Sequence, residues 1–391
     1  MLSRKVLIDM RNSRENMTIN FNKPSIVGYE IKYIRDAVAR GQLSGDGHYT
    51  KLCSELIEKK TGSKKALITH SCTGALEMAA ILCDLKPGDE VIMPSYTFVS
   101  TANAVVLRGA VPVFVDIDSK TLNVDSSRIE AAINSRTKAI FVVHYAGFVC
   151  DMDSIQDIAK KHGLLLVEDA AQALGSSYKG RPAGSFGDLA AFSFHETKNI
   201  ISGEGGALCI NNEALITRAE IIREKGTNRT QFFNGQVDKY TWVDIGSSYL
   251  PGELIAAFLF GQLECMDNIR KRRISIFERY EEEFKHINDQ RLKSLPKYLE
   301  ANEGNGHMFY LMLNSFESRT KFIAHMRKCN ITTPFHYIPL HSAPAGLKYA
   351  KVIGDMTNTN DVSERLVRLP MYSDLGNDIE QVITSTLEFF S

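Results

Sequence analysis

Short apolar runs rich in β-branched residues alternate with helical patterns between residues 66 and 211. This alternation is typical of βαβ units arranged around a largely parallel sheet. The last two strands are joined by a loop too short for a crossover helix, so we expect one strand to run antiparallel to the rest. The pattern predicts seven strands, at residues 66–69, 90–94, 111–117, 139–145, 164–169, 189–194 and 206–211.

Helical periodicity fills the segments between these strands and continues after them. The predicted helices cover residues 73–84, 98–108, 126–134, 151–162, 212–225, 252–265 and about 270–287. At 391 residues the chain is longer than one compact unit usually is, so we expect two domains. The predicted parts are an N-terminal extension over residues 1–18, with Met17 as an alternative start, a large domain over 19–265 and a smaller C-terminal α/β domain over 266–391.

The composition narrows the kind of partner. Lys and Arg together number 46, as do Asp and Glu, so no global charge attracts nucleic acid or an anionic membrane. The seven cysteines are scattered singly without a CxxC pair, which favours neither a metal site nor a disulfide framework and fits a reducing cytoplasm. No apolar run approaches the roughly 18 residues of a membrane span. We therefore predict a cytoplasmic protein with a small-molecule ligand.

Polar residues follow the ends of two predicted strands. The run "LLLVED" ends with Asp169, and Lys198 follows the strand at 189–194. In an open α/β sheet, ligands bind beyond the carboxyl ends of the strands, where both residues are expected to lie. A carboxylate buried there needs a positive or proton-donating partner, because burying it alone is unfavourable by several kcal/mol. Taken singly, Asp169 fits equally a helix cap and Lys198 a solvated loop residue.

An anion site is predicted where "ITHSCTGALEMAAIL" (68–82) passes from a strand into a helix. The free N–H groups and the dipole at a helix N-terminus attract a phosphate, and Ser71 and Thr73 can add hydroxyl donors. Thr73 is also explained as an ordinary N-cap. A phosphate site, an aspartate for a ring nitrogen and a lysine for an aldehyde together suit pyridoxal 5′-phosphate (PLP). Phe98, with Tyr96 as the second choice, would stack on the ring, although Phe98 is equally explained as a core residue.

At these residues the chain resembles the DegT/DnrJ/EryC1/StrS sugar aminotransferase family. The resemblance covers nearly all of residues 19–391 and implies the PLP-dependent aspartate-aminotransferase fold (fold type I), an α/β fold with a mostly parallel sheet. It also implies a homodimer with shared active sites. The segments that carry it are "NKPSIVGYE", "GDG", "GDEVIMPSYTFVSTANA", "VEDAAQ", "SFHETKN", "GEGG", "REKGTNR", "DIGSSYL" and "FHYIPLH".

The resemblance also implies roles at matching positions. It assigns covalent attachment of PLP to Lys198, the pyridine nitrogen to Asp169, the ring hydroxyl to Gln172, and the phosphate to Thr73, the Gly74 backbone and Ser193. Many relatives have asparagine where this chain has Ser248 and use it on the phosphate across the dimer. Ser248 is expected to make the same contact, although its side chain is shorter than that of asparagine.

The resemblance further implies a reaction. Some relatives are PLP-dependent sugar dehydratases with histidine in place of the lysine, so Lys198 favours transamination. The expected reaction converts dTDP-4-dehydro-6-deoxy-D-glucose and L-glutamate into dTDP-4-amino-4,6-dideoxy-D-galactose and 2-oxoglutarate, for enterobacterial common antigen or the O-antigen of lipopolysaccharide. The alternatives are formation of the 4-amino-4,6-dideoxyglucose epimer, a 3-ketosugar or a UDP- or GDP-linked substrate, and a non-catalytic PLP-fold binding protein.

The loop "TPFHYIPLHSAP" (333–344) is the candidate sugar pocket. Its His336, Tyr337 and His341 would hydrogen-bond the sugar and its diphosphate, whereas the two prolines make a purely structural loop an equal explanation. Asn228 and Arg229 are weaker candidates for contact with an anion, since a surface loop uses the same residues. His195 either assists Lys198 or packs at the strand end.

Overall fold

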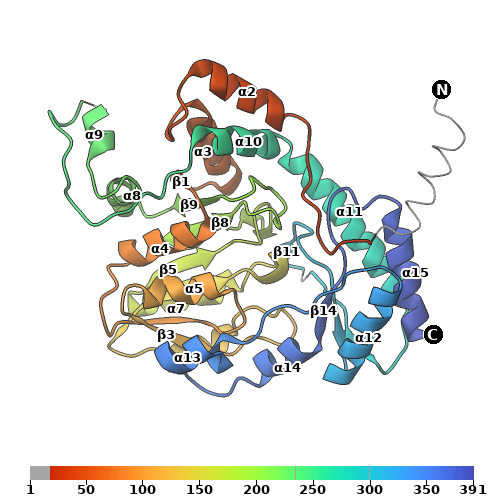
Figure 1. The fold of residues 1–391 in the computed structure, drawn as a ribbon. Helices are drawn as coiled ribbons and strands as arrows, with labels where there is room; N and C mark the ends of the chain where they lie inside the picture. The colour runs from red at the N-terminus through yellow and green to blue at the C-terminus, as the bar shows by residue number, and fades with distance from the viewer. Residues whose placement is uncertain (1–17, 234, 299) are drawn as a thin grey trace, which may run out of the picture.

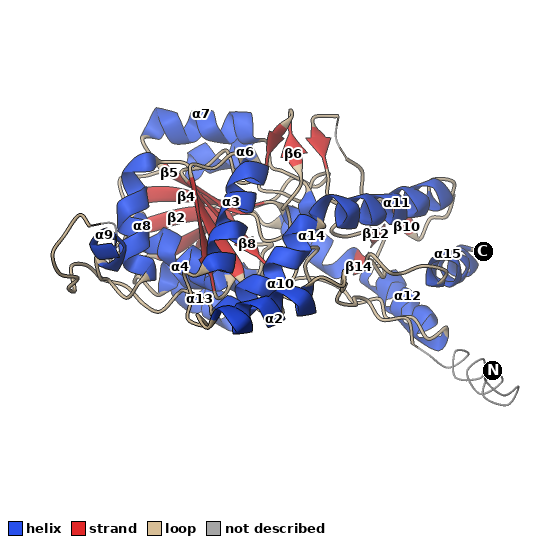
Figure 2. Cartoon of the chain, turned by 90° about the horizontal axis from the view of Figure 1, so that it is seen from above, coloured by secondary structure: helices blue, strands red, loops and turns tan. Residues whose placement is uncertain are grey.

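The computed structural model describes residues 18–233, 235–298 and 300–391. The predicted N-terminal extension, with Met17, lies outside these residues except for residue 18. An eight-stranded sheet with helices on both faces forms the larger part of the molecule, and a smaller α/β part lies beside it (Figure 1, Figure 2). The predicted α/β class with a mostly parallel sheet is confirmed.

The central sheet has the strand order β1-β9-β8-β5-β4-β2-β3-β13. As predicted, one strand departs from the parallel arrangement: β9 is antiparallel to both β1 and β8. The strands of this sheet, in chain order, are β1 (Lys65–Thr69), β2 (Glu90–Pro94), β3 (Val111–Val115), β4 (Thr137–Val143), β5 (Leu165–Asp169), β8 (Leu189–Ser193), β9 (Gly206–Ile210) and β13 (Lys351–Val352).

The prediction of seven strands is wrong by one. The eighth strand, β13, comes from the C-terminal part of the chain and pairs in parallel with β3 at the edge of the sheet. It has only two residues, so it has no periodicity that a sequence pattern could register. This pairing joins the C-terminal part to the central sheet.

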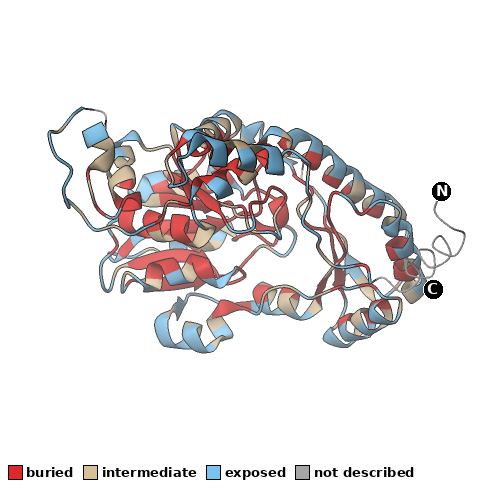
Figure 3. Ribbon diagram, turned by 45° about the horizontal axis from the view of Figure 1, so that its top comes forward, coloured by how far each residue is buried: buried red, intermediate tan, exposed pale blue. Residues whose placement is uncertain are grey.

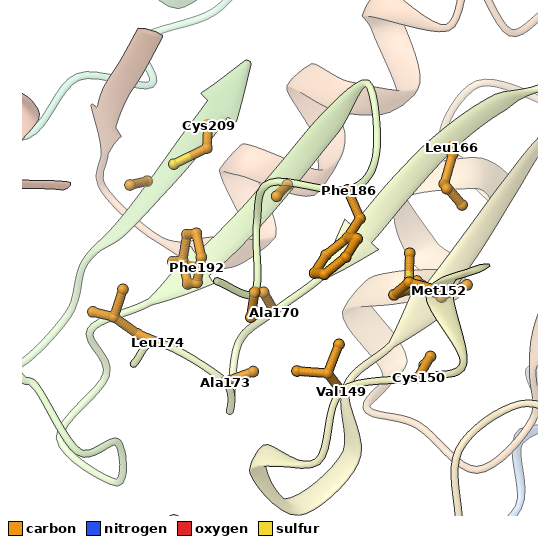
Figure 4. Packing of buried hydrophobic residues seen from close by; sticks show 14 of the residues in the cluster. Val149, Cys150, Met152, Leu166, Ala170, Ala173, Leu174, Phe186, Phe192 and Cys209 are labelled. Atoms are coloured by element: carbon orange, nitrogen blue, oxygen red, sulfur yellow. The ribbon is translucent and has the colours of Figure 1, made fainter. Parts of the chain in front are cut away.

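Alternate residues of each strand pack against different helices, which explains why the strands are apolar throughout. On one face Ile68, Ile92 and Val113 join a core completed by α3 (His48–Thr61), α7 (Met152–His162) and α10 (Glu253–Glu264). On the other face Leu67 and Val91 join a core completed by α4 (Cys72–Leu82), α5 (Val99–Val106) and α8 (Ile216–Arg223). Buried residues accordingly concentrate on the strands and the inner helix faces (Figure 3), and Figure 4 shows the first core around Phe186 and Phe192.

The predicted helices are present, with one difference at the end of a helix and one at the start of another. Residues 126–134 form a short α6 followed by a 3₁₀ turn, and residues 213–215 form a 3₁₀ turn before α8. The helices of this part are α2 (Glu30–Arg40), α3 (His48–Thr61), α4 (Cys72–Leu82), α5 (Val99–Val106), α6 (Ser126–Ile129), α7 (Met152–His162), α8 (Ile216–Arg223), α9 (Arg229–Phe233) and α10 (Glu253–Glu264).

A second sheet and its helices form a core of their own in the C-terminal part. Aromatic and aliphatic side chains from α11 (Met266–Phe284), α12 (Phe316–Lys328) and α15 (Asp378–Phe390) pack on β12 (Tyr310–Leu313) and β14 (Leu366–Arg368). Phe277, Phe309 and Val382 belong to this core. The domain boundary after residue 265 stays a prediction. The remaining helices are α11 (Met266–Phe284), α12 (Phe316–Lys328), α13 (Pro344–Tyr349), α14 (Thr357–Arg365) and α15 (Asp378–Phe390).

Two small sheets complete the fold. One has the order β10-β12-β14 and the other β11-β6-β7, which brings residues 302–303 against 177–182. Within the described ranges, no helix combines the length and the apolar character that crossing a membrane requires. The strands of these two sheets are β6 (Ser177–Tyr178), β7 (Arg181–Pro182), β10 (Leu292–Ser294), β11 (Asn302–Glu303), β12 (Tyr310–Leu313) and β14 (Leu366–Arg368).

Candidate active site

A cavity of about 650 Å³ opens at the carboxyl edge of the central sheet, between the sheet and the C-terminal part. Eight of the residues predicted from the sequence line it together. They are Thr73, Phe98, Asp169, Gln172, Ser193, Lys198, His336 and Tyr337. The cavity also includes His195 and several residues that the sequence did not indicate.

Lys198 lies on a tight loop that joins β8 to β9. The loop is closed by backbone hydrogen bonds from Phe194 to Gly205 (2.8 Å) and from Glu196 to Gly203 (2.9 Å), which return the chain into the next strand. Burial, reinforced by the positive charge of Arg368, holds the pKa of Lys198 below its ordinary value. A larger fraction of the amine is therefore neutral near physiological pH, as a nucleophile or a base requires.

Asp169 ends β5 and is buried at the cavity wall. One carboxylate oxygen accepts a hydrogen bond from the Thr101 hydroxyl (2.6 Å), and the other accepts the N–H of Ala171 (3.2 Å). Burial raises the pKa of Asp169, although these two hydrogen bonds and the nearby Lys198 oppose the rise. Within the described residues no Lys, Arg or His side chain forms a salt bridge with it, so the carboxylate can still take a cationic N–H donor from a ligand.

The N-terminus of α4 forms the base of the cavity. Ser71 is the N-cap and accepts the N–H of Gly74 (3.0 Å), so that N–H is already used. The N–H groups of Cys72 and Thr73 start the helix and have no acceptor within it. Gly206 of β9 lies against them, where a Cβ would be 2.4 Å from the Cys72 nitrogen. This close approach requires glycine and leaves the helix end open to an anion.

Two hydroxyls complete this end of the cavity. The Thr73 hydroxyl lies 2.8 Å from that of Ser100, and the Ser193 hydroxyl accepts the N–H of His195 (3.4 Å). His195 also contacts the Thr197 hydroxyl (2.9 Å) from the rim of the cavity. The donors and the helix end fit a phosphate. Asp169, which forms no salt bridge within the described residues, fits a protonated pyridine, so the residues present suit PLP.

The candidate sugar loop contributes a stack of rings to the wall. His336 and Tyr337 stack with their centroids 3.7 Å apart, and the Tyr337 hydroxyl accepts from the side-chain amide of Gln172 (2.8 Å). The Gln172 oxygen accepts the N–H of Ala146 (2.7 Å). Burial, with nearby cations, lowers the pKa of His336 well below its ordinary value. Gln172 thereby joins the sheet edge to the loop.

Phe98 lies at the cavity rim, exposed for 57% of its surface, and its ring centroid is 6.4 Å from that of Tyr337. It is therefore not a core residue, and a planar ligand could lie against it. Tyr96, the second choice, is fully buried and packs against Tyr145 at 5.1 Å instead. The predicted stacking role of Phe98 stays a prediction.

Besides Gly74, whose N–H donates to Ser71, four predicted residues do not line this cavity. His341 contacts the Ser95 hydroxyl (2.8 Å) and fixes its own loop to the end of β2. Asn228, Arg229 and Ser248 lie elsewhere: Asn228 accepts the N–H of Thr241, and Ser248 bridges the backbone of Glu224. Arg229 forms a salt bridge with Glu224 (3.4 Å). The roles assigned to these four residues stay predictions.

The sequence did not indicate Arg273, His307 and Arg368 as cavity residues, nor Thr101, which bonds Asp169 from outside the cavity lining. Arg273 is buried, and its guanidinium donates to the carbonyls of Gly306 and Met371. Burial lowers the pKa of Arg273 to about 10. Arg368 packs over a phenylalanine ring at 4.3 Å, and its Nε has no acceptor among the described residues. The only sequence signal was a charge inside the apolar run "RLVRLPM".

The buried carboxylate of Glu168, next to Asp169 in the chain, holds the opposite side of β5 in place. It accepts from His144 Nε2 (2.8 Å) and from the N–H groups of Gly184, Phe186 and Gly187 (2.7 Å each). Four donors therefore converge on one carboxylate that is fully buried. This arrangement fixes the turn before β8, the strand that leads to Lys198.

We expect Glu168→Gln to lower the free energy of unfolding by about 3 kcal/mol, because an amide cannot accept four hydrogen bonds and turns its NH₂ toward backbone donors. Urea unfolding would measure the change. Glu278→Gln, at an exposed helix position, is the matched control and should unfold like wild type. A Glu168→Gln protein as stable as the control would contradict this reading of the turn.

Comparison with known proteins agrees with the site. The chain is 34% identical to the spore coat polysaccharide biosynthesis protein SpsC of Bacillus subtilis, over 95% of this chain and 96% of that protein. It is 30% identical to the UDP-4-amino-4-deoxy-L-arabinose–oxoglutarate aminotransferase of Shewanella sediminis, over 94% and 96%. The PLP form of Spr1654 from Streptococcus pneumoniae superposes with a TM-score of 0.86 at 28% identity, covering 95% of this chain and 99% of that one.

The fold and the cavity thus define a PLP-dependent transaminase that acts on keto-sugars with an amino donor such as glutamate. The model of the DegT/DnrJ/EryC1/StrS aminotransferase family matches residues 24–388, and the chain belongs to that family. The predicted family, fold type, enzyme class and cofactor are confirmed. The alternative of a non-catalytic binding protein is not supported.

Proposed function

We propose that the protein transfers the amino group of L-glutamate to C4 of a nucleotide-linked 4-keto-6-deoxy sugar, dTDP-4-dehydro-6-deoxy-D-glucose. The products are dTDP-4-amino-4,6-dideoxy-D-galactose and 2-oxoglutarate. The observation that carries the proposal is the partly buried Lys198 in one cavity with Asp169, which has no cationic partner among the described residues. The relative named for a 4-amino-4-deoxy sugar supports position 4.

In this proposal, different residues of the chain bind the cofactor and transfer the proton. When bound, PLP supplies an electron sink for the electron pair left as a C–H bond breaks. Asp169 would hold the proton on the pyridine nitrogen, and the end of α4 with Thr73 and Ser193 would bind the phosphate. Lys198 would carry a proton between the cofactor carbon C4′ and the sugar carbon. Its lowered pKa favours this role, because the neutral amine accepts the proton.

The charge of the cavity suits anionic ligands. Arg273, Arg368 and Lys198 line the same cavity as Asp169, and the dicarboxylate glutamate and the diphosphate of a nucleotide sugar are both anions. The imidazole ring of His336 and the hydroxyl group of Tyr337 would form hydrogen bonds to the sugar. These features support the nucleotide link without choosing between dTDP, UDP and GDP.

A homodimer is part of the proposal. The segment from α9 to residue 245 exposes large apolar side chains, among them Trp242 (79% exposed) and Phe233 (68%). Ser248, Asn228 and Arg229 belong to the same region, so a second copy docked there could bring them to its neighbour's cavity. Sedimentation velocity should give a dimer, and a 43.7 kDa monomer at every concentration would contradict the proposal.

The test is incubation of the purified PLP-loaded enzyme with L-glutamate and dTDP-4-dehydro-6-deoxy-D-glucose, followed by NMR of the product. We expect an axial 4-amine, the galactose configuration. An equatorial amine would instead assign the 4-amino-4,6-dideoxyglucose product. Turnover only with a UDP- or GDP-linked sugar or with a 3-ketosugar would replace the proposed substrate. The dTDP-galactose product would suit assembly of enterobacterial common antigen or of an O-antigen of lipopolysaccharide.

A further inference from the structure

His307 lines the cavity from the segment between β11 and β12. Its main chain is fixed on both sides, because its N–H donates to Asn305 (3.0 Å) and its carbonyl accepts from Arg273 (2.8 Å). Gly306 before it has φ 62°, and a Cβ there would lie 2.7 Å from the Arg273 backbone. Only glycine permits this turn, so the position of His307 is built into the chain.

The side chain of Asn199, next to Lys198, fixes which ring nitrogen of His307 carries hydrogen. The Asn199 amide nitrogen donates to the carbonyl of Asn305 (2.9 Å), so the amide oxygen faces His307 Nδ1 (2.9 Å). An amide oxygen only accepts hydrogen bonds, so Nδ1 must be the donor. A neutral imidazole has one N–H, which leaves a lone pair on Nε2.

The ring stays neutral near physiological pH. Burial lowers the pKa of His307 well below its ordinary value, and the positive charges of Lys198, Arg273 and Arg368 lower it further. Among the described residues, no hydrogen-bond partner meets Nε2, and the ring belongs to the cavity wall. The cavity therefore contains an uncharged acceptor close to Lys198.

This acceptor distinguishes between the two substrates. The cavity cations suit the carboxylates of glutamate, which are themselves acceptors at neutral pH and gain nothing from a lone pair, and the amino group of glutamate, its only donor, is the group given up in the reaction. A sugar hydroxyl is a donor. Because Lys198 would act at the keto carbon, the hydroxyl on the neighbouring carbon is the group that meets the wall beside Lys198.

We infer that His307 Nε2 accepts a hydrogen bond from the hydroxyl next to the keto group of the sugar, and that this contact selects the keto-sugar in its half-reaction. The inference rests on the proposed function and deepens it by naming a residue for the recognition of the sugar. Asn199 and Asn305 act on the sugar only through His307, as positioning residues.

Two substitutions of His307 separate the hydrogen bond made by Nδ1 from the acceptor at Nε2. His307→Asn keeps an amide where Nδ1 was, within reach of Asn199, and removes the acceptor at Nε2. His307→Gln places an amide oxygen near the position of Nε2. His286→Asn, at an exposed position outside the cavity, is the matched control and should keep the wild-type rates of both half-reactions.

The two half-reactions are followed separately by the absorbance of the cofactor. We expect His307→Asn to lower kcat/KM for dTDP-4-dehydro-6-deoxy-D-glucose by about 10- to 100-fold. Its rate with glutamate should stay near that of wild type, and His307→Gln should recover part of the loss. With the analogue that lacks the 3-hydroxyl, wild type and His307→Asn should be equal. Equal losses in both half-reactions, or a retained preference for the 3-hydroxyl, would overturn the inference.

The tautomer gives a readout that needs no turnover. Nitrogen-15 NMR of histidine-labelled enzyme, with His307→Asn used to assign the signal, should show a hydrogen on Nδ1 and none on Nε2 near neutral pH. A hydrogen on Nε2, or a charged ring, would overturn the inference even in an enzyme with the proposed activity. If the wild-type enzyme does not turn over dTDP- or UDP-linked 4-keto sugars, the proposed substrate is wrong. The NMR measurement would still test the tautomer of His307 in that case.

Discussion

Replacement of Lys198 with alanine is expected to reduce amine transfer by a factor on the order of 10⁴, through loss of the positioned acid-base group. The visible absorbance band of lysine-bound PLP should disappear at the same time, because no other lysine lines the cavity in the described residues. Absorbance spectra and steady-state rates of the purified variant would test both expectations. The fold should persist, since Lys198 lies on a loop that is closed by main-chain hydrogen bonds.

Lys120→Ala is the matched control, because Lys120 is exposed and lies outside the cavity. It should keep both the band and the rate of wild type. Addition of a small primary amine should restore a small part of the rate to Lys198→Ala, since the amine can carry the missing proton. A variant that keeps the band and more than a tenth of the wild-type rate would show that another residue performs this role.

Replacement of Asp169 with asparagine is expected to lower the rate about 10²- to 10³-fold, because the charge that opposes a pyridinium is removed while the shape remains. The amide can still bond the Thr101 hydroxyl, so the change isolates the charge. Both half-reactions should suffer, since each needs the same electron sink. This shared loss is the opposite of the selective loss expected at His307.

The control for Asp169→Asn is Asp157→Asn on the exposed surface of α7. Thr101→Val should give a smaller loss than Asp169→Asn, because it removes a hydrogen bond to the carboxylate but not the charge. Single-turnover absorbance changes with glutamate would measure both. An Asp169→Asn enzyme with the rate of the Asp157 control would contradict the assigned role.

The strands of the central sheet could be predicted because each is a short apolar run that is buried on both faces. The antiparallel β9 followed from the short loop after β8, as the structure has it. Strand β13 could not be predicted, because its two residues carry no pattern and its partner β3 lies more than 200 residues earlier. The 3₁₀ turns after α6 and before α8 could not be predicted either, because helical periodicity does not distinguish a 3₁₀ turn from an α-helical one.

Some cavity residues could also be predicted from the sequence and others could not. Lys198, Asp169 and Thr73 follow strand ends, so the topology places them at one edge and the sequence could indicate them. His307 and Arg368 come from the C-terminal part, so their place in the cavity depends on how the two parts pack, which no local pattern records. Arg273 belongs to the charged start of the helix predicted at about 270–287 and is nevertheless buried.

Strand β13 has a further consequence for the behaviour of the protein in concentrated solution. Without it, β3 would be the last strand and would present unpaired N–H and C=O groups along an apolar edge. Such an edge is a template on which other chains can add strands and aggregate. Lys351 and Val352 pair with β3, and the N–H of Ile353 bonds to Phe114 (3.0 Å). A segment more than 200 residues after β3 in the chain thus covers the edge, and newly made chains remain prone to self-association until it docks.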